Sequence, residues 1–193
     1  MTPALVLDRV SCLRGDRLLF ESLDLVLGPG DGALVQGPNG AGKSSLLRIA
    51  AGLMTPTAGQ VRRTGPIAWD AAADALDEER PLGAVLAFWA RMDGRDAHDL
   101  RRATEAMAIE SLAPVPVRLL STGQRRRAAL ARVIASGASI WLLDEPANGL
   151  DSHAQERLAT VIASHRERGG IVLAASHQPI GMAATRTIRL GHA

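Results

Sequence analysis

The chain contains 193 residues, 47% of them hydrophobic and 22% charged, which is the composition of one ordinary globular domain with a sizeable core. Its formal net charge of +2 is too small to indicate a nucleic-acid-binding protein. We find no apolar run near the ~18 residues that cross a bilayer, and Asp8 and Arg9 come too early for a signal peptide. The lone cysteine, Cys12, excludes an intrachain disulfide and favours a reducing compartment.

Short strands and tight turns are expected before the first helix. Aliphatic runs predict the strands, and clusters of glycine, proline and aspartate predict the turns. The expected strands cover residues 5–13, 18–20 and 23–27, and the expected turns cover residues 14–16 and 28–32.

A glycine-rich stretch then separates a short buried strand, residues 32–36, from a helix-like run, residues 44–51. It fits the pattern G-x-x-x-x-G-K-[ST] of the phosphate-binding loop, in the strand–loop–helix context that this motif needs. Its backbone N–H groups would turn inward on an anion, Lys43 would reach the β- and γ-phosphates, and the Ser44 hydroxyl would bind Mg²⁺. The predicted nucleotide-binding residues of this loop are Gly37, Pro38, Asn39, Gly40, Ala41, Gly42, Lys43, Ser44 and Ser45.

Lys43 is the only lysine among the 22 Lys and Arg residues of the chain. A compact ammonium fits among phosphates and loop amides where a planar guanidinium would not. The lysine therefore favours a phosphate site over a glycine-rich turn that matches the pattern by chance.

The middle of the chain differs in composition from both ends. After a connection rich in proline and glycine over residues 52–61 and a strand over 67–69, residues 72–118 are alanine-rich with charged spacers. We expect this section, with helices over residues 82–92 and 96–108, to be a short helical subdomain inserted into a core formed by residues 1–71 and 119–193.

Helices and strands alternate along the rest of the chain. We expect helices over residues 123–136 and 152–168 and strands over residues 140–143, 171–175 and 187–190. The alternation predicts an α/β fold with a mainly parallel sheet covered on both faces and antiparallel strands at the N-terminus. Together with the phosphate-binding loop, it indicates a P-loop NTPase core.

Two further stretches carry candidate chemistry. The apolar strand over residues 140–143 runs into Asp144, placed to hold Mg²⁺ through its water shell, and Glu145, placed to orient and deprotonate water. An acidic pair that only ends a strand is the alternative. The stretch at Ser121, Gly123 and Gln124 begins a helix and offers N–H groups and a hydroxyl to phosphate oxygens, although a simple serine cap would have the same sequence.

Five ordered motifs together resemble the ATP-binding-cassette (ABC) ATPases over nearly the whole chain. They are similar to the Walker A loop, signature motif, Walker B strand, D-loop and switch histidine of that family, and they lie at residues 37–45, 120–124, 140–145, 148–151 and 175–177.

The resemblance implies a dimer, made by self-association or with a second cassette, that encloses ATP between the phosphate loop of one subunit and Ser121, Gly123 and Gln124 of the other. It adds Asp151 to the nucleotide site and assigns catalysis to Glu145, His177 and Lys43. Ser44 and Asp144 would hold the metal, so ATP and Mg²⁺ are the expected cofactors. Integral membrane permease subunits are the expected partners, at the cytoplasmic face of the inner membrane.

The chain also departs from the family pattern. A glutamine usually contacts Mg²⁺ and the membrane partner between the two subdomains, but Ala73 or Asp74 stands near that position. Asp70 and Asp74 are interpreted as solvated loop carboxylates. Arg14 stands where an aromatic residue usually stacks on adenine, and we expect its guanidinium to stack there instead.

Shorter segments resemble the ATP-binding subunits of cytochrome c maturation systems, the haem-exporter class. They cover residues 12–20, 88–91 and 123–127. This resemblance implies a complex that uses ATP for haem export or for release of a haem-loaded chaperone. The histidines outside the motifs are scattered and suggest no haem site in this chain, namely His98, His153, His165 and His192.

Three alternatives stay open at this stage. The chain could serve another small-cargo transporter, or act as a low-turnover assembly switch that binds ATP. A phosphate-loop kinase for small molecules is disfavoured by the signature stretch, Glu145 and His177.

Overall fold

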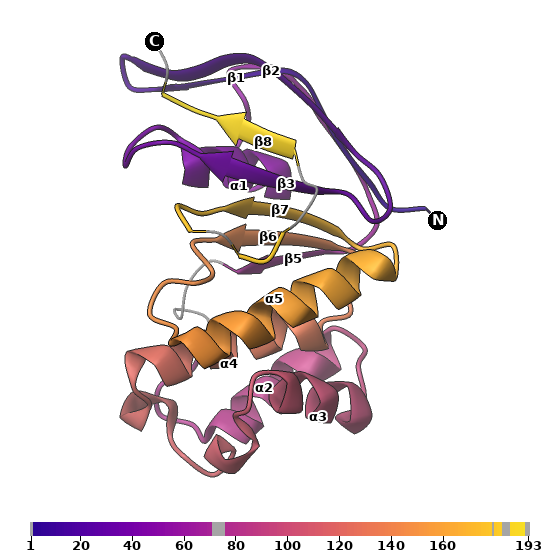
Figure 1. Ribbon diagram of the computed structural model, residues 1–193, viewed down its shortest axis with the longest axis vertical. Coiled ribbons are helices and arrows are strands. Elements are labelled where there is room, and N and C mark those ends of the chain that lie inside the picture. The colour runs from indigo at the N-terminus through magenta and orange to yellow at the C-terminus, as the bar shows by residue number, and fades with distance from the viewer. Residues whose placement is uncertain (1, 71–75, 179, 183–185, 192–193) are drawn as a thin grey trace.

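The structure is a computed structural model that describes residues 2–70, 76–178, 180–182 and 186–191. It contains a three-stranded antiparallel sheet, a five-stranded parallel sheet and helices on both faces of the parallel sheet (Figure 1). This arrangement confirms the α/β fold class expected from the alternation of helix and strand. None of the described helices is long and apolar enough to cross a membrane.

The antiparallel sheet has the order β2-β1-β4 and consists of β1 (Ala4–Arg14), β2 (Arg17–Leu27) and β4 (Ala58–Thr64). The prediction of two short strands over residues 18–27 was wrong, because β2 is continuous. A bulge explains the interruption in the hydrophobic pattern: Arg9 and Ser22 have φ values of 47° and 49°, and the pairing register shifts beside them. Side chains complete the hydrogen bonding there, since Ser22 N donates to Ser11 Oγ at 3.0 Å.

The parallel sheet has the order β5-β6-β7-β3-β8, and all four of its pairings are parallel. All five strands therefore end at the same edge, which is where open α/β sheets place ligands. The strands are β3 (Gly32–Gln36), β5 (Ile67–Asp70), β6 (Ile140–Asp144), β7 (Ile171–Ala175) and β8 (Arg186–Arg189).

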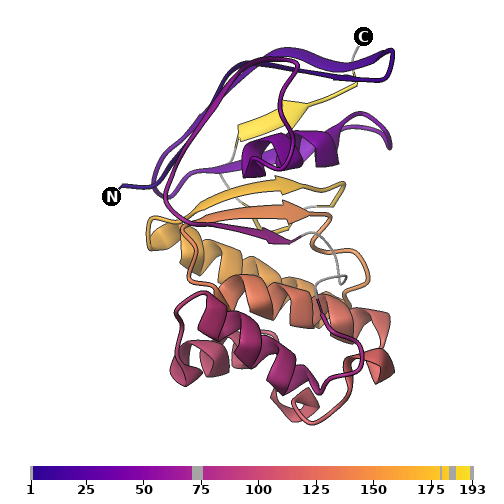
Figure 2. The ribbon, with the colours of Figure 1, turned by 180° about the vertical axis from the view of Figure 1, so that it is seen from behind.

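Both faces of the parallel sheet are buried. Along β6, Ile140 and Leu142 join a core with α1 (Lys43–Ala51) and the antiparallel sheet, whereas Trp141 and Leu143 join a second core with helices on the other side. That side is covered by α4 (Thr122–Ala135) and α5 (Ser152–Glu167), and Figure 2 shows α1 between the two sheets. Each fully buried aliphatic side chain contributes about 1.5–3 kcal/mol, so β6 is a central element of both cores.

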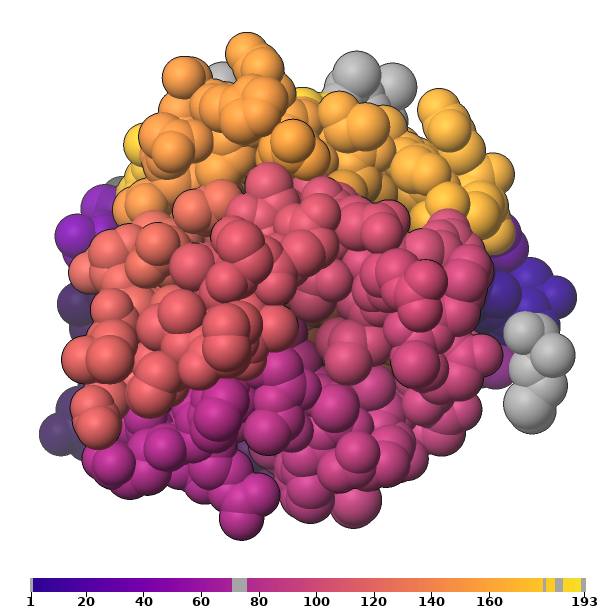
Figure 3. All heavy atoms as spheres, turned by 90° about the horizontal axis from the view of Figure 1, so that it is seen from below, coloured from indigo at the N-terminus to yellow at the C-terminus, as the bar shows by residue number. Residues whose placement is uncertain are grey.

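The section between β5 and α4 is helical. It contains α2 (Leu82–Met92), α3 (Ala97–Ala106), and the short 3₁₀ helices η2 (Glu110–Leu112) and η3 (Val117–Leu119). Figure 3 shows α2, α3 and the start of α4 filling one face of the molecule, with α5 at its margin. The two predicted helices are confirmed. α3 begins one residue later than expected because Asp96 caps it, and it ends two residues earlier, at Ala106. The division of the chain at residues 72 and 118 stays a prediction.

A histidine is buried at the amino-terminal edge of the parallel sheet. The ring of His165 stacks on Trp141 with 3.7 Å between centroids and 8° between planes. Burial lowers the pKa of His165 to about 4, although the backbone groups of Ile171 and Ser139 oppose the shift. The imidazole is therefore neutral in the folded protein at pH 7.

We predict that this neutral histidine makes stability depend on pH. Because the pKa of His165 falls from 6.5 in the unfolded chain to about 4 in the folded one, the folded state binds fewer protons between these values. The contribution is complete above pH 6.5 and is lost as pH falls toward 4. Relative to His165→Phe, which keeps the stacking, wild type should lose about 2–3 kcal/mol of unfolding free energy between pH 7 and pH 4, measured by urea titration. Parallel pH profiles for the two proteins would contradict this assignment.

Candidate functional site

The phosphate loop joins β3 to α1 in a conformation that requires glycine. Gly37 has φ +151°, and a Cβ there would lie 2.5 Å from the carbonyl oxygen of Leu190. Gly42 is the N-cap of α1, and no described side chain accepts a hydrogen bond from the first turn of that helix. The N–H groups at the start of α1 therefore point to a place where an anion fits.

Lys43 occupies the centre of this loop and is only 7% exposed. Its Nζ donates to the carbonyl oxygen of Gly37 at 2.9 Å and to Nε2 of His177 at 2.7 Å, and it lies 3.7 Å from Oε1 of Glu145. An ammonium can only donate, so Nε2 of His177 accepts and its proton is on Nδ1. Lys43 thus contacts a residue that lies 134 positions later in the sequence.

Asp144 and Glu145 lie at the exit of β6, next to Lys43. Glu145 has φ +47°, a left-handed conformation that costs a non-glycine residue about 1–2 kcal/mol. Its amide donates to the carbonyl oxygen of Ala175 at 2.8 Å, and its Oε2 accepts from the backbone N–H of His177 at 3.3 Å. Its other oxygen lies 3.4 Å from Nε2 of His177. The carboxylate is therefore held between the ends of two neighbouring strands.

A cavity of about 350 Å³ lies over these groups. Ser44 and Asp144 both line it, and their hydroxyl and carboxylate oxygens are hard ligands of the kind that Mg²⁺ prefers. The donor set therefore fits Mg²⁺. The lining residues are Arg14, Leu19, Asn39, Gly40, Gly42, Lys43, Ser44, Ser45, Asp144 and Glu145.

Arg14, the predicted partner of adenine, lines the same cavity at the end of β1. Its Nη1 lies 3.3 Å from Sδ of Met54. This position leaves its stacking role a prediction.

The predicted signature residues lie elsewhere. Ser121 is the N-cap of α4 and forms a reciprocal capping box with Gln124, whose side chain accepts from Ser121 N at 2.9 Å. A Cβ on Gly123 would lie 2.9 Å from the carbonyl oxygen of Gly149, so the start of α4 packs against the segment before Asp151. Asp151 caps α5 by accepting from Ala154 N at 2.8 Å. Among the described residues, none of the predicted signature or D-loop residues lines the cavity at Lys43.

The region of the missing glutamine is only partly described. Ala73 and Asp74 lie outside the described residues. The interpretation of Asp70 as a solvated loop carboxylate was wrong, because it ends β5, is 2% exposed and pairs with Arg126 at 2.7 Å. Burial raises the pKa of Asp70 to about 6, while Arg126 opposes the shift. Sequence reasoning missed this pair, although Asp70 follows an apolar strand just as Asp144 does.

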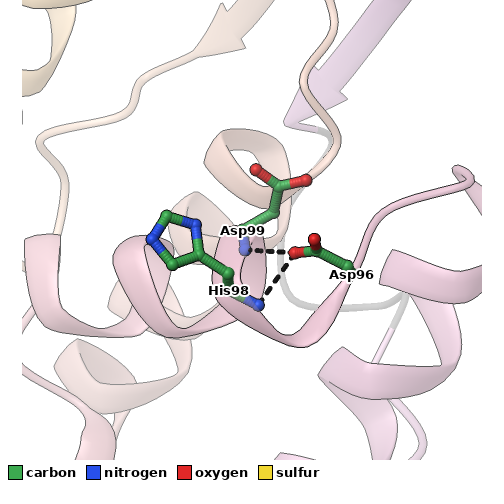
Figure 4. Close-up of side chains that lie close together, drawn as sticks. All are labelled: Asp96, His98 and Asp99. Carbon is green, nitrogen blue, oxygen red and sulfur yellow. Dashed lines mark hydrogen bonds between the residues drawn. The ribbon is translucent and has the colours of Figure 1, made fainter.

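Two other features of the surface lie away from the phosphate loop. A cavity of about 970 Å³, bordered by Trp141 and His165, lies at the amino-terminal edge of the sheet, away from the phosphate loop. Asp96, His98 and Asp99 offer ligand atoms within 4.8 Å of one another. Figure 4 shows the Asp96 carboxylate accepting from the backbone N–H groups of His98 and Asp99, so the cluster is explained as a helix cap.

Comparison with known families decides the kind of protein that carries this site. A family profile described as ABC transporter matches residues 20–148. The chain belongs to the ABC transporter family. As an ABC ATPase it is 62% identical to the "Cytochrome c biogenesis ATP-binding export protein CcmA" of Sphingopyxis alaskensis, over 92% of this chain and 91% of that protein. The protein of the same name from Zymomonas mobilis is 51% identical over 94% of this chain and 81% of its own length.

Solved structures agree with the fold of this ABC ATPase. The structure titled "Structure of ATP binding subunit of ABC transporter" matches with a TM-score of 0.85 at 21% identity, over 96% of this chain and 85% of that one. A bacterial Atm1-family ABC exporter with ATP bound matches with a TM-score of 0.83 at 19% identity, over 98% of this chain and 37% of that one. Both likenesses confirm the fold.

We predict that Lys43→Arg and Lys43→Met each weaken ATP binding by about tenfold or more. The guanidinium cannot enter the space that the compact ammonium fills, and methionine removes the charge. Equilibrium dialysis with ATP measures the affinity. Arg48→Lys, an exposed position on the same helix, serves as the matched control and should bind like wild type. An unchanged affinity of Lys43→Arg for ATP would show that the loop does not bind phosphate through this side chain.

Proposed function

We propose that this chain is the ATP-hydrolysing subunit of a membrane complex for cytochrome c biogenesis, working in haem export or in release of a haem-loaded chaperone. The observation that carries the ATPase assignment is the convergence of Lys43, Glu145 and His177 at the start of α1. The cargo assignment rests on relatives at 62% and 51% identity that are named as cytochrome c biogenesis export proteins.

The site residues divide the reaction among them. Glu145 orients and deprotonates the attacking water. His177 holds this carboxylate through its backbone N–H, which donates to Oε2 at 3.3 Å, and its ring lies beside Lys43, where the γ-phosphate would enter. Lys43 releases its contacts to Glu145 and His177 and turns to the phosphates when ATP enters, because the phosphate charge exceeds that of one carboxylate. Mg²⁺ held by Ser44 and Asp144 would supply charge neutralisation at the phosphates.

A second subunit completes the site. Among the described residues, Ser121, Gly123 and Gln124 do not line the cavity at Lys43; they lie at the start of α4. Two copies of the chain, or a pair with another cassette, place these residues of one subunit over the phosphates held by the other. ATP then joins the subunits and hydrolysis separates them. The chain is a peripheral subunit at the cytoplasmic face of the plasma membrane, and integral permease subunits receive this motion.

We predict that Glu145→Gln abolishes ATP hydrolysis while ATP-dependent dimers accumulate. The amide keeps the shape of the side chain but cannot accept the proton of water, so the closed state is not released. Phosphate release measures hydrolysis, and size-exclusion chromatography with ATP measures dimer formation. Glu156→Gln, an exposed change on α5, is the control. Equal hydrolysis by wild type and Glu145→Gln would overturn the catalytic assignment.

The membrane assignment is tested by the proteins that bind the trapped state. A tagged Glu145→Gln chain, expressed in cells and purified from detergent-solubilised membranes with ATP, should co-purify with integral subunits that handle haem. Mass spectrometry identifies them, and the same preparation without ATP gives the background. Recovery of an unrelated permease in their place would overturn the cytochrome c assignment and leave the ATPase assignment intact.

A further inference from the structure

The backbone around Glu145 is held by a side chain that the proposed reaction does not use. We propose that Arg126 is a positioning residue that fixes Glu145 in its active orientation, and that Asp70 holds Arg126 in place. The inference rests on the proposed function, because it takes Glu145 to be the group that activates water.

Glu145 needs such support because its backbone is strained. At φ +47° it occupies a region that residues with a Cβ avoid, and such conformations persist only where the surroundings fix them. The hydrogen bond from its own amide to Ala175 fixes one side of the residue. The carbonyl groups of the two flanking residues, Asp144 and Pro146, have still to be held.

Arg126 holds both of these carbonyl groups. Its Nη2 donates to the carbonyl oxygen of Asp144 at 2.9 Å, and its Nε donates to the carbonyl oxygen of Pro146 at 3.2 Å. These carbonyls belong to the residues on either side of Glu145. Since the guanidinium is planar and rigid, one side chain sets the distance and relative orientation of two peptide planes.

Asp70 determines where the guanidinium lies. Its Oδ1 accepts from Nη1 of Arg126 at 3.1 Å, its Oδ2 lies 2.7 Å from Nη2, and its side chain is fully buried while that of Arg126 is 11% exposed. Asp70 is the last residue of β5 and pairs in register with Leu143 of β6, which places it one residue from the exit of the Walker B strand. Arg126 itself lies five positions after Ser121, so the same contacts connect the signature helix to the water-activating carboxylate.

The competing explanation is that this buried pair only stabilises the fold. Removing one member leaves a buried charge without its partner, which is strongly destabilising in general. A loss of activity in such a variant would therefore not separate positioning from stability. The test has to keep the fold and alter only the link to the two carbonyls.

The decisive variant is Arg126→Lys. Lysine keeps a cation beside Asp70, but its ammonium cannot span both carbonyls with one rigid group. In the transporter complex purified through the tagged chain, we expect kcat to fall about tenfold or more while KM for ATP stays within about twofold. Arg95→Lys is the matched control, because Arg95 donates to two carbonyls, those of Ser136 and Gly137, at the other end of α4. It should keep kcat within about twofold of wild type.

A double variant, Asp70→Leu with Arg126→Met, removes both charges without leaving either unpaired. If the pair positions Glu145, this protein folds but keeps the low kcat, as seen by thermal melting and phosphate release. Recovery of wild-type kcat in the double variant, or a wild-type kcat in Arg126→Lys, would overturn the inference, as would failure of both variants to fold. Glu145→Gln, measured beside them, separates the two proposals: if it hydrolyses normally the proposed function fails, whereas if it is inactive and Arg126→Lys is normal, only the positioning role fails.

Discussion

One buried ammonium connects the parts of this molecule that matter for its chemistry. Lys43 is the first residue of α1, and its Nζ contacts the exit of β3 through Gly37, the exit of β6 through Glu145 and the segment after β7 through His177. These contacts are possible because neighbouring parallel strands end at one edge of the sheet. The alternating burial along β6, with one side chain toward α1 and the next toward α4 and α5, keeps that edge in register.

The local parts of this arrangement could be predicted from the sequence. A phosphate loop consists of a strand, a glycine-rich turn and a helix in immediate succession. The motif at residues 37–45 can therefore be recognised from nine consecutive positions. The Asp144–Glu145 pair follows a continuous apolar strand, and its place at the sheet edge follows from parallel pairing. These motifs depend on residues that are neighbours in the sequence. Composition and spacing were therefore enough to predict them.

Features that depend on distant pairing could not be predicted in the same way. Asp70 and Arg126 are 56 positions apart, and their contact depends on β5 lying beside β6 and on the rotation of α4 about its axis. The three consecutive arginines at 125–127 have different partners, which the sequence did not indicate. Arg125 pairs with exposed Glu78, and Arg126 holds the turn after the Walker B strand. Arg127 donates to the carbonyls of Met107 and Ala108. The continuous β2 was hidden for a related reason, since a bulge interrupts the alternation of apolar residues.

The contrast between one lysine and many arginines follows from what each cation does. Arg63 donates to the carbonyls of Ile49 and Ala50 at the end of α1, Arg95 to two carbonyls at the end of α4, and Arg126 to the two that flank Glu145. A planar fork suits pairs of carbonyl groups that a helix end or a strained turn leaves without partners, and it holds them in a fixed geometry. In the proposed mechanism Lys43 does the opposite, because its partners change when a nucleotide enters. A point charge on a flexible stem can exchange a carboxylate for phosphate oxygens without moving the loop around it, whereas a guanidinium bound at two points would hold the loop in its empty state. In this proposal the arginines hold the framework in a fixed geometry, and the single lysine is the cation that changes partners within it.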